Sequence, residues 1–302
     1  MSREGFRRSL REKGPLSLKT HPSKKHGGEI LRVAKSPVVT MAPTTPIYDG
    51  IRIMTKEGFR RIPIASPGTK MLEGIVTAMD IIDYLGGGKK FEIIQRRFRG
   101  NFFKAINEPV KLVMTKKVVS AKTSAKISEA IELMTEQNLG GLPVVDDENR
   151  VRAIITERDV ANMFADRISG VTVAQLMSKK VVTAIPKTTI FEAAKTMISR
   201  GFRRLPIISE DKVVGIITAM DIIRFFGSGK VFKYLKSGTM IQVLNTPALE
   251  IATKDVATIK PNVDVGQAAK IMQEKNIGAL PVVKNEKLMG IITERDFFKI
   301  IG

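Results

Sequence analysis

The sequence of 302 residues contains no cysteine, which excludes disulfide bonds and thiolate chemistry and favours a cytoplasmic location. Histidine is almost as scarce. The two copies, His21 and His26, lie near the N-terminus, so none further along could act as a general base or metal ligand. No run approaches the roughly 18 apolar residues of a membrane-spanning helix, and the chain starts without the apolar core of a signal peptide. We therefore expect no membrane partner.

Acidic residues are too few to balance the basic ones. The chain has 50 Lys and Arg against 30 Asp and Glu, a net charge of +20. This excess predicts anionic partners such as nucleotide phosphates or nucleic acid, although a Lys-rich proteome would also explain it. Residues 1–30 are basic and poor in apolar residues, and we expect a flexible tail there. That tail could be a solvated arm or could bind an acidic partner such as nucleic acid.

The rest of the chain repeats one unit four times. Each copy contains Gly or Ala, two apolar residues and Thr-x-x-Asp, beginning at Gly74, Ala153, Gly215 and Gly290. Before this string come a short β-rich run, an amphipathic helix and an apolar-Pro-apolar strand, and after it comes a last helix. The β-rich runs are 37–40, 117–120, 180–183 and 256–259. The unit is thus β-α-β-β-α, and its roughly 50 to 60 residues are marginal without a partner.

The amphipathic helices share one pattern. Each apolar stripe ends on a methionine, and four residues later stands a Gly or Asn that tolerates the left-handed conformation ending a helix. The methionines are Met54, Met134, Met197 and Met272, followed by Gly58, Asn138, Gly201 and Asn276. We predict that this stripe is core rather than a cofactor site.

The repeats alternate in type, which indicates that an ancestral pair was duplicated. The segment 58–63 matches 201–206, whereas 138–143 matches 276–281. Pair 1 is predicted at 31–166, with repeats at about 36–86 and 110–166. Pair 2 is predicted at 167–302, with repeats at about 172–227 and 250–302. Within each pair an insert of about 25 residues separates the repeats, and the first insert is basic.

Thr-x-x-Asp at the start of a helix has two interpretations. It is a variant capping box, in which the side chains cap the helix N-terminus. It could equally be a nucleoside-phosphate cradle, since helix N–H groups and a Thr hydroxyl bind phosphate oxygens and a carboxylate can accept from two ribose hydroxyls. The pairs are Thr77 and Asp80, Thr156 and Asp159, Thr218 and Asp221, and Thr293 and Asp296.

Arginines near these strings supply the positive charge that phosphates need. Arg60-Arg61 and Arg203-Arg204 precede the second strand of repeats 1 and 3, where one of two successive side chains must face the cleft. Arg158 and Arg295 lie inside the Thr-Glu-Arg-Asp strings of repeats 2 and 4. Guanidinium groups clamp phosphate bidentately. Solvated basic pairs are the alternative.

Patterns of catalytic residues are missing from the repeats. There is no nucleophile elbow, no cysteine and no histidine there, and no acid–base pair stands out from spacing. A non-catalytic binding protein is the better interpretation, with no metal and no tightly held cofactor.

With its apolar-Pro-apolar strand and Thr-x-x-Asp string, the unit resembles the CBS-domain family, named after cystathionine β-synthase. The order of two pairs is similar to the γ subunit of AMP-activated protein kinase and to archaeal four-repeat proteins like it. The resemblance implies two pseudo-twofold Bateman modules in a flat disk of α/β (α+β) class, with ligand clefts between repeats. It also implies that the four Asp bind ribose hydroxyls and the four Thr bind ribose or phosphate. In the γ subunit a His-Arg pair faces the phosphates, where this chain has Arg60-Arg61 and Arg203-Arg204.

The first functional hypothesis is therefore a regulatory, energy-sensing protein that binds AMP, ADP or ATP and controls an unidentified protein partner. A narrower variant replaces the nucleotide by S-adenosylmethionine, against which the paired arginines argue. The second hypothesis is nucleic-acid binding through the basic tail and insert. A homodimer is a further expectation.

Overall fold

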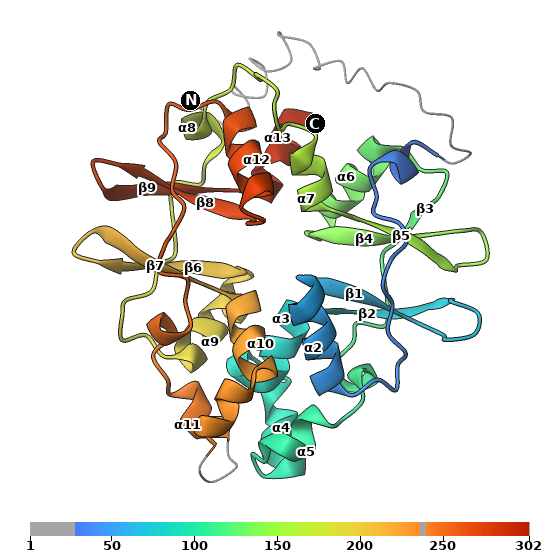
Figure 1. Cartoon of the computed structure of the whole chain (residues 1–302). Helices are drawn as coiled ribbons and strands as arrows, with labels where there is room; N and C mark the ends of the chain where they lie inside the picture. The colour runs from blue at the N-terminus through green and yellow to red at the C-terminus, as the bar shows by residue number, and fades with distance from the viewer. Residues whose placement is uncertain (1–27, 236–239, 302) are drawn as a thin grey trace.

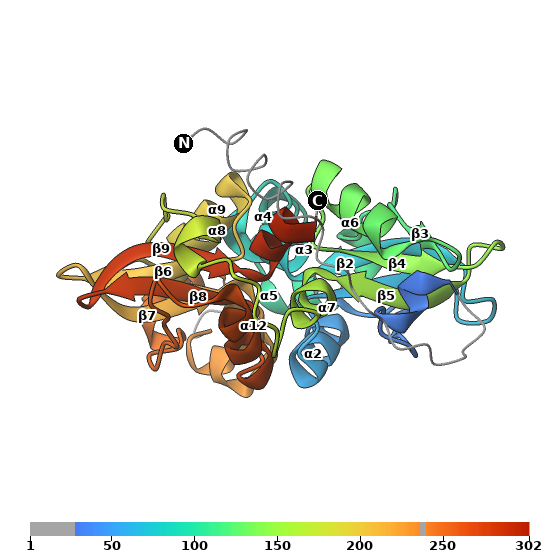
Figure 2. The ribbon, with the colours of Figure 1, turned by 90° about the horizontal axis from the view of Figure 1, so that it is seen from above.

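The structure is a computed structural model that describes residues 28–235 and 240–301. Four repeats of mixed α and β structure surround a common centre, one in each quadrant of Figure 1. Turned by 90°, the molecule is flattened (Figure 2). The predicted disk of four α/β repeats is confirmed.

Each repeat has the predicted helix, strand, strand, helix order. Repeat 1 contains α2 (Ile47–Glu57), β1 (Arg61–Ala65), β2 (Leu72–Thr77) and α3 (Ala78–Ile82). Repeat 2 contains β3 (Ala121–Lys122), α6 (Ile127–Glu136), β4 (Gly141–Val145), β5 (Val151–Thr156) and α7 (Glu157–Asn162). Repeat 3 contains α9 (Ile190–Arg200), β6 (Arg204–Ser209), β7 (Lys212–Thr218) and α10 (Ala219–Gly227). Repeat 4 contains α12 (Val265–Glu274), β8 (Ala279–Lys284), β9 (Lys287–Thr293), the 3-10 helix η6 (Glu294–Phe297) and α13 (Phe298–Ile301).

The methionine stripe is core, as predicted. All four methionines at the ends of α2, α6, α9 and α12 are buried. The Gly or Asn four residues later adopts the left-handed conformation in every repeat, with φ between 53° and 69°. Each helix therefore ends where its apolar stripe ends.

The predicted opening strands are wrong in all four repeats, because none of the runs 37–40, 117–120, 180–183 and 256–259 forms a regular strand. Repeat 2 comes nearest, since the two-residue β3 follows its run directly and pairs in parallel with β4. The other repeats form single parallel bridges, Met41 to Ile64, Ala184 to Ile207 and Ile259 to Val282. Each of these segments meets the edge of its sheet at one residue, so the bridge does not extend into a longer ladder. In repeat 1, Val39 of the predicted run is exposed.

The two repeats of a pair are joined through their sheets. In pair 2 the strands form one four-stranded sheet, in the order β6-β7-β9-β8, because Lys212 of β7 pairs with Lys287 of β9. In pair 1 the sheets β1-β2 and β3-β4-β5 are separate, and a bridge between Met71 and Arg150 links them.

Segments between repeats also cross over within each pair. In each repeat, one residue of the segment that leads into the first helix bridges the last strand of the other repeat in the pair. These bridges are Lys35 to Ile154, Thr115 to Ile75, Ser178 to Ile291 and Thr253 to Ile216. Each repeat thus completes its sheet edge with backbone from its neighbour.

This crossover corrects the predicted tail boundary. Gly28–Arg32 includes the 3-10 helix η1 (Glu29–Arg32), and Ile30 is fully buried in the core of repeat 2. The folded part of the chain therefore starts before residue 31. The rest of the predicted tail, residues 1–27, lies outside the described residues.

Helices join the two pairs. α10 and η2 (Asp83–Gly87), the π-helical continuation of α3, pack on α2 and α9, and one apolar cluster spans repeats 1 and 3. α7 packs on η6 and α12, so repeats 2 and 4 share a second contact. The connectors fit this packing: a Cβ at Gly227 would lie 2.7 Å from Ile51 Cγ2, and one at Gly87 2.9 Å from Ile198 Cγ1.

The inserts add short helices at the rim below repeats 1 and 3 (Figure 1). They are α4 (Phe91–Phe98), α5 (Phe102–Ile106), η3 (Val110–Leu112), η4 (Gly229–Lys233), α11 (Met240–Leu244) and η5 (Ala248–Glu250). A further helix, α8 (Val173–Leu176), precedes repeat 3. Within the described ranges, no helix is long and apolar enough to cross a membrane.

Candidate functional site

All four Thr-x-x-Asp strings form reciprocal capping boxes. In repeat 1 the Thr77 N–H and hydroxyl donate to Asp80 Oδ2 at 2.9 and 2.6 Å, and Thr77 Oγ1 accepts from Asp80 N at 3.2 Å. The same Thr-to-carboxylate bonds, at 2.6 to 2.9 Å, fix Asp159, Asp221 and Asp296. The capping interpretation is therefore correct, and it occupies one oxygen of each carboxylate.

The other carboxylate oxygen differs among the repeats. Asp80 Oδ1 accepts from Lys90 at 2.7 Å, Asp221 Oδ1 from Arg224 at 2.8 Å and Asp296 Oδ1 from Lys299 at 2.5 Å. Asp159 makes no such bond to the residues that the structure describes. Burial raises the pKa of Asp159, against the Thr156 bonds and the charge of Lys35. Asp159 thus has an acceptor oxygen available for a ligand.

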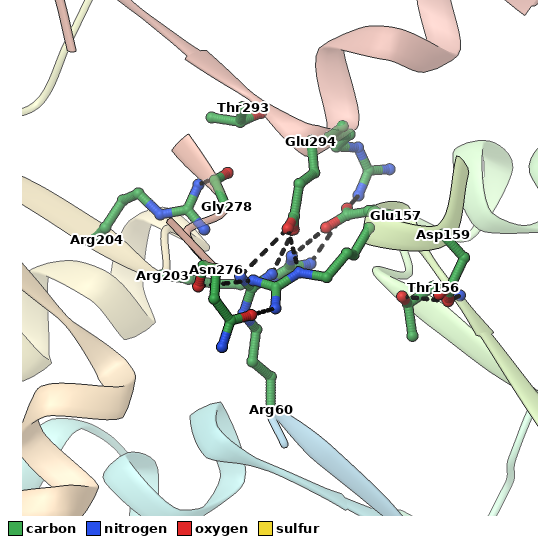
Figure 3. A network of polar contacts seen from close by, with 12 residues as sticks. Arg60, Thr156, Glu157, Asp159, Arg203, Arg204, Asn276, Gly278, Thr293 and Glu294 are labelled. Carbon is green, nitrogen blue, oxygen red and sulfur yellow. Dashed lines mark hydrogen bonds and ion pairs between the residues drawn. The ribbon is translucent and has the colours of Figure 1, made fainter. Parts of the chain in front are cut away.

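The six predicted arginines converge on the centre of the disk, where they meet two glutamates that sequence analysis did not single out. Figure 3 shows Glu157 and Glu294 directed at the guanidinium groups. The two glutamates are 3% and 2% exposed. We call these eight residues the central cluster: Arg60, Arg61, Arg158, Arg203, Arg204, Arg295, Glu157 and Glu294. It carries an excess of four positive charges.

Each glutamate binds two arginines from the other pair of repeats. Glu294 of repeat 4 pairs with Arg60 and, at 2.7 Å, with Arg158 Nε. Glu157 of repeat 2 pairs with Arg203 and, at 3.2 Å, with Arg295 Nη1. Burial alone would raise the pKa of Glu294, but Arg60 and Arg158 outweigh it and lower that pKa to about 2. Both glutamates are therefore ionised counter-ions.

Two arginines of the central cluster have no carboxylate partner. The Arg61 side chain makes no hydrogen bond or ion pair to any described residue, and Arg204 Nη1 donates to the Gly278 carbonyl at 2.8 Å. Burial and the charge of Arg203 lower the pKa of Arg61 to about 9. Burial and Arg60 lower the pKa of Arg204 to about 10. Both guanidiniums are partly buried and lack the anion that such a position calls for.

Glycines in the even repeats make room for the arginines of the odd ones. A Cβ at Gly140 would lie 2.3 Å from Arg203 Nη2 and 2.5 Å from Arg61 Nη2. A Cβ at Gly278 would lie 2.4 Å from Arg60 Nη2. The alternation of Arg-Arg with Gly-Gly or Gly-Ala is thus steric as well as electrostatic.

A pocket of about 120 Å³ opens beside the Thr156 box. Its wall includes Lys35, Phe59, Arg61, Arg158 and Glu294. It is smaller than the ~300–1,000 Å³ typical of small-molecule sites. It runs between Thr156 and Arg61, whereas Asp159 lies behind Thr156 and does not line it.

A CBS domain model matches residues 28–87, 110–166, 173–228 and 248–302. The chain belongs to the CBS domain family. An uncharacterized protein of Methanocaldococcus jannaschii, MJ1225, is 39% identical over 273 residues, covering 89% of this chain and 98% of that protein. Its crystal structure, described as a candidate archaeal homologue of g-AMPK, has a TM-score of 0.86 at 38% identity, covering 91% of this chain and all of the other. The predicted similarity to such archaeal four-repeat proteins is confirmed.

Other relatives extend the family beyond one organism. An uncharacterized 33.4 kDa protein in the ribosomal RNA operon of Thermofilum pendens is 33% identical over 267 residues, which are 88% of this chain and 89% of that protein. An uncharacterized conserved protein from Pyrococcus horikoshii shares the fold, with a TM-score of 0.58 at 21% identity over 89% of this chain and 98% of the other.

Every arginine of the central cluster and every Thr and Asp of the Thr-x-x-Asp strings were predicted from the sequence, but the two glutamates were not. A signal for them was present: repeats 2 and 4 have Thr-Glu-Arg-Asp where repeats 1 and 3 have Thr-Ala-Met-Asp. Glu157 and Glu294 looked like ordinary acidic residues in the first turn of a helix. Their role depends on arginines at least 46 residues away in sequence.

Proposed function

We propose that this CBS-domain protein is a non-catalytic regulator that binds adenine nucleotides (AMP, ADP or ATP) in clefts between its repeats. The excess of four positive charges in the partly buried central cluster carries this proposal. Phosphate groups are the anions that such guanidinium clusters bind best. The four carboxylates around the centre would accept the ribose hydroxyls, and nucleotide occupancy would alter the activity of a protein partner.

The cleft of repeat 2 is the best-formed candidate. There one carboxylate oxygen of Asp159 accepts no hydrogen bond from the described residues. Phe59 and Arg61 line the neighbouring pocket, and the Arg61 side chain has no ion-pair partner among the described residues. A ribose on Asp159 would direct a phosphate toward Arg61. In the other repeats a Lys or Arg must first leave the Asp carboxylate.

Titration calorimetry with AMP, ADP, ATP and S-adenosylmethionine tests the proposal. We expect nucleotides to bind in preference to S-adenosylmethionine, because its sulfonium cation would be repelled by the arginines. Asp159→Asn keeps the shape of the side chain but removes its charge. It should weaken nucleotide binding by roughly tenfold to a hundredfold, the cost of losing hydrogen bonds to a charged group.

A matched control is Asp264→Asn. Asp264 caps α12 by accepting from Gly266 N at 2.7 Å and belongs to no Thr-x-x-Asp box. It should reduce stability without changing nucleotide affinity. Equal binding by wild type and Asp159→Asn would rule out the cleft of repeat 2, and no binding of any nucleotide would rule out the proposed function.

The basic N-terminal segment supports a second candidate, nucleic-acid binding. Between Met1 and Lys35 there are ten basic and three acidic residues. The deletion that tests it should stop at residue 27, because Ile30 is core. Salt-sensitive RNA or DNA binding that is lost on this deletion would support the candidate. Binding that survives the deletion would move the site elsewhere.

A further inference from the structure

The central cluster contains two classes of arginine. Arg61 and Arg204 have no carboxylate partner among the described residues, so an incoming phosphate can use them at once. The other four are held by Glu157 and Glu294. A ligand anion reaches those four only by competing with a carboxylate that is already in place.

The two carboxylates occupy the positions where further phosphate charge would lie. Glu294 lines the pocket together with Arg60, Arg61 and Arg158. It accepts from Arg60 with both oxygens and from Arg158 Nε at 2.7 Å, as a bidentate phosphate would. The small size of the pocket follows, since the Arg60–Glu294–Arg158 bridge forms part of its wall.

Glu157 has the equivalent arrangement on the other side of the centre. It accepts from Arg203 with both oxygens and from Arg295 Nη1 at 3.2 Å. Both glutamates stand between the Thr and the Asp of their own capping boxes, so the fixed first turn of the helix holds them close to an incoming phosphate chain.

We propose that Glu157 and Glu294 are specificity-determining residues that limit how much phosphate charge the central cluster accepts. This inference rests on the proposed function. A first phosphate binds the available arginine on its own side of the centre, Arg61 beside Gly140 or Arg204 beside Gly278. Each additional phosphate must displace a glutamate from its arginines and stays close to its negative charge. The cluster therefore discriminates against triphosphates in favour of monophosphates.

The test measures the ratio of ATP affinity to AMP affinity by calorimetry in the full-length protein. Glu157→Gln and Glu294→Gln preserve the shape of the side chains and remove their charge. Each should raise that ratio about tenfold, because removing one close like charge favours the more highly charged ligand. A double variant should raise it further.

The control is Glu132→Gln, the same change of charge at an exposed position of α6 with no partner among the described residues. It should leave the ratio unchanged. Glu294→Asp keeps the charge but alters the packing, and should keep the ratio near that of wild type. A ratio within twofold of wild type in both single Gln variants would overturn the inference. Equal changes in the Asp and Gln variants would overturn it too, because they would indicate a merely structural role.

Folding is checked by a thermal melt of each variant, and each single variant retains one carboxylate. Inorganic phosphate and tripolyphosphate are titrated in parallel, so that this inference and the proposed function can fail separately. If nucleotides bind but the ratio of ATP to AMP affinity is the same in wild type and in the Gln variants, only the inference is overturned. If tripolyphosphate binding depends on the glutamates but no nucleotide binds, only the proposed function is overturned. If wild type binds neither kind of ligand, both are overturned.

Discussion

Arg60 and Arg61 are neighbours in sequence but lie in opposite electrostatic situations. Arg60 pairs with the buried Glu294, whereas Arg61 makes no ion pair among the described residues and is repelled by Arg203. In the absence of ligand, one side chain should stabilise the fold and the other should oppose it. At the residue scale, we therefore expect Arg60 to contribute mainly to stability and Arg61 mainly to ligand binding.

We predict that Arg61→Met leaves the thermal stability of the ligand-free protein unchanged or higher, because it removes an uncompensated, partly buried charge. Nucleotide affinity should fall by roughly tenfold or more, since a charge-assisted bond to phosphate is lost. Arg60→Met should instead lower the free energy of unfolding by about 1–3 kcal/mol, because Glu294 keeps only Arg158. Differential scanning calorimetry of both variants checks this, and equal destabilisation would contradict it.

The pKa of Glu294 makes stability depend on acid pH. In the folded protein this pKa is lowered from 4.5 to about 2. The ion pairs of Glu294 therefore stabilise the fold fully above pH 4.5 and are lost as the pH falls from about 4.5 to about 2.

Across this window wild type should lose about 3 kcal/mol of unfolding free energy more than Glu294→Gln, at about 1.4 kcal/mol per pH unit. Urea denaturation at pH 5 and pH 3 covers about 1.5 pH units of this window and should show about 2 kcal/mol of the difference. Glu132→Gln should follow the wild-type curve. Parallel curves for wild type and Glu294→Gln would show that Glu294 titrates near its ordinary pKa.

At the scale of elements, the last strand of each repeat packs closely against the crossing segment from the other repeat of its pair. A Cβ at Gly290 of β9 would lie 2.7 Å from Met177 Sδ and 2.8 Å from the Ser178 carbonyl oxygen. In repeat 2 the equivalent residue is Ala153, and Ala34 shares its buried cluster in place of a methionine. The limited space between strand and crossing segment is thus filled in two ways, by Gly290 against Met177 and by Ala153 with Ala34.

We predict that Gly290→Ala destabilises the protein by about 1–3 kcal/mol through overpacking. Met177→Ala should relieve the contact, so the two changes should couple by about 0.5–3 kcal/mol in a double-mutant cycle of urea denaturation. Ala153→Gly provides the reverse control, with a smaller cost of about 1 kcal/mol from backbone entropy. Additive effects of the first two changes would contradict the proposed contact.

At the scale of the whole molecule, neither pair of repeats is complete alone. The apolar cluster of repeat 1 continues into repeat 3, and each glutamate of the central cluster neutralises arginines of the other pair. A separated pair would expose buried helix faces and leave its arginines without counter-ions.

We therefore expect the fragment 28–166 to self-associate, using a second copy in place of pair 2, because exposed apolar faces of this kind rarely stay free. Size-exclusion chromatography with light scattering should show a dimer or larger species. Gly227→Leu in the full-length chain, which would place a side chain against Ile51, should loosen the same contact. A fragment that is monomeric and folded would show that the pairs are independent.

The repeat, its family and its local chemistry follow from short stretches of the amino-acid sequence. The helix stripes, left-handed caps and Thr-x-x-Asp boxes are encoded within a few residues and occur four times, so each copy supports the interpretation of the others. The last helices were only partly predictable, since α3 continues into the π-helix η2 and the last segment divides into η6 and α13. Helix type there depends on packing between the pairs rather than on local pattern.

Which charged side chains pair with one another depends on how the four repeats pack together. Arg60 and Glu294 are separated by 234 positions, and nothing local distinguishes Arg60 from Arg61. Their different roles arise because the pseudo-twofold arrangement brings a carboxylate from the opposite pair to one of them and leaves the other facing the pocket. The strength of each ion pair therefore depends on the complete assembly of four repeats, since removing charges from water strengthens the interactions between them.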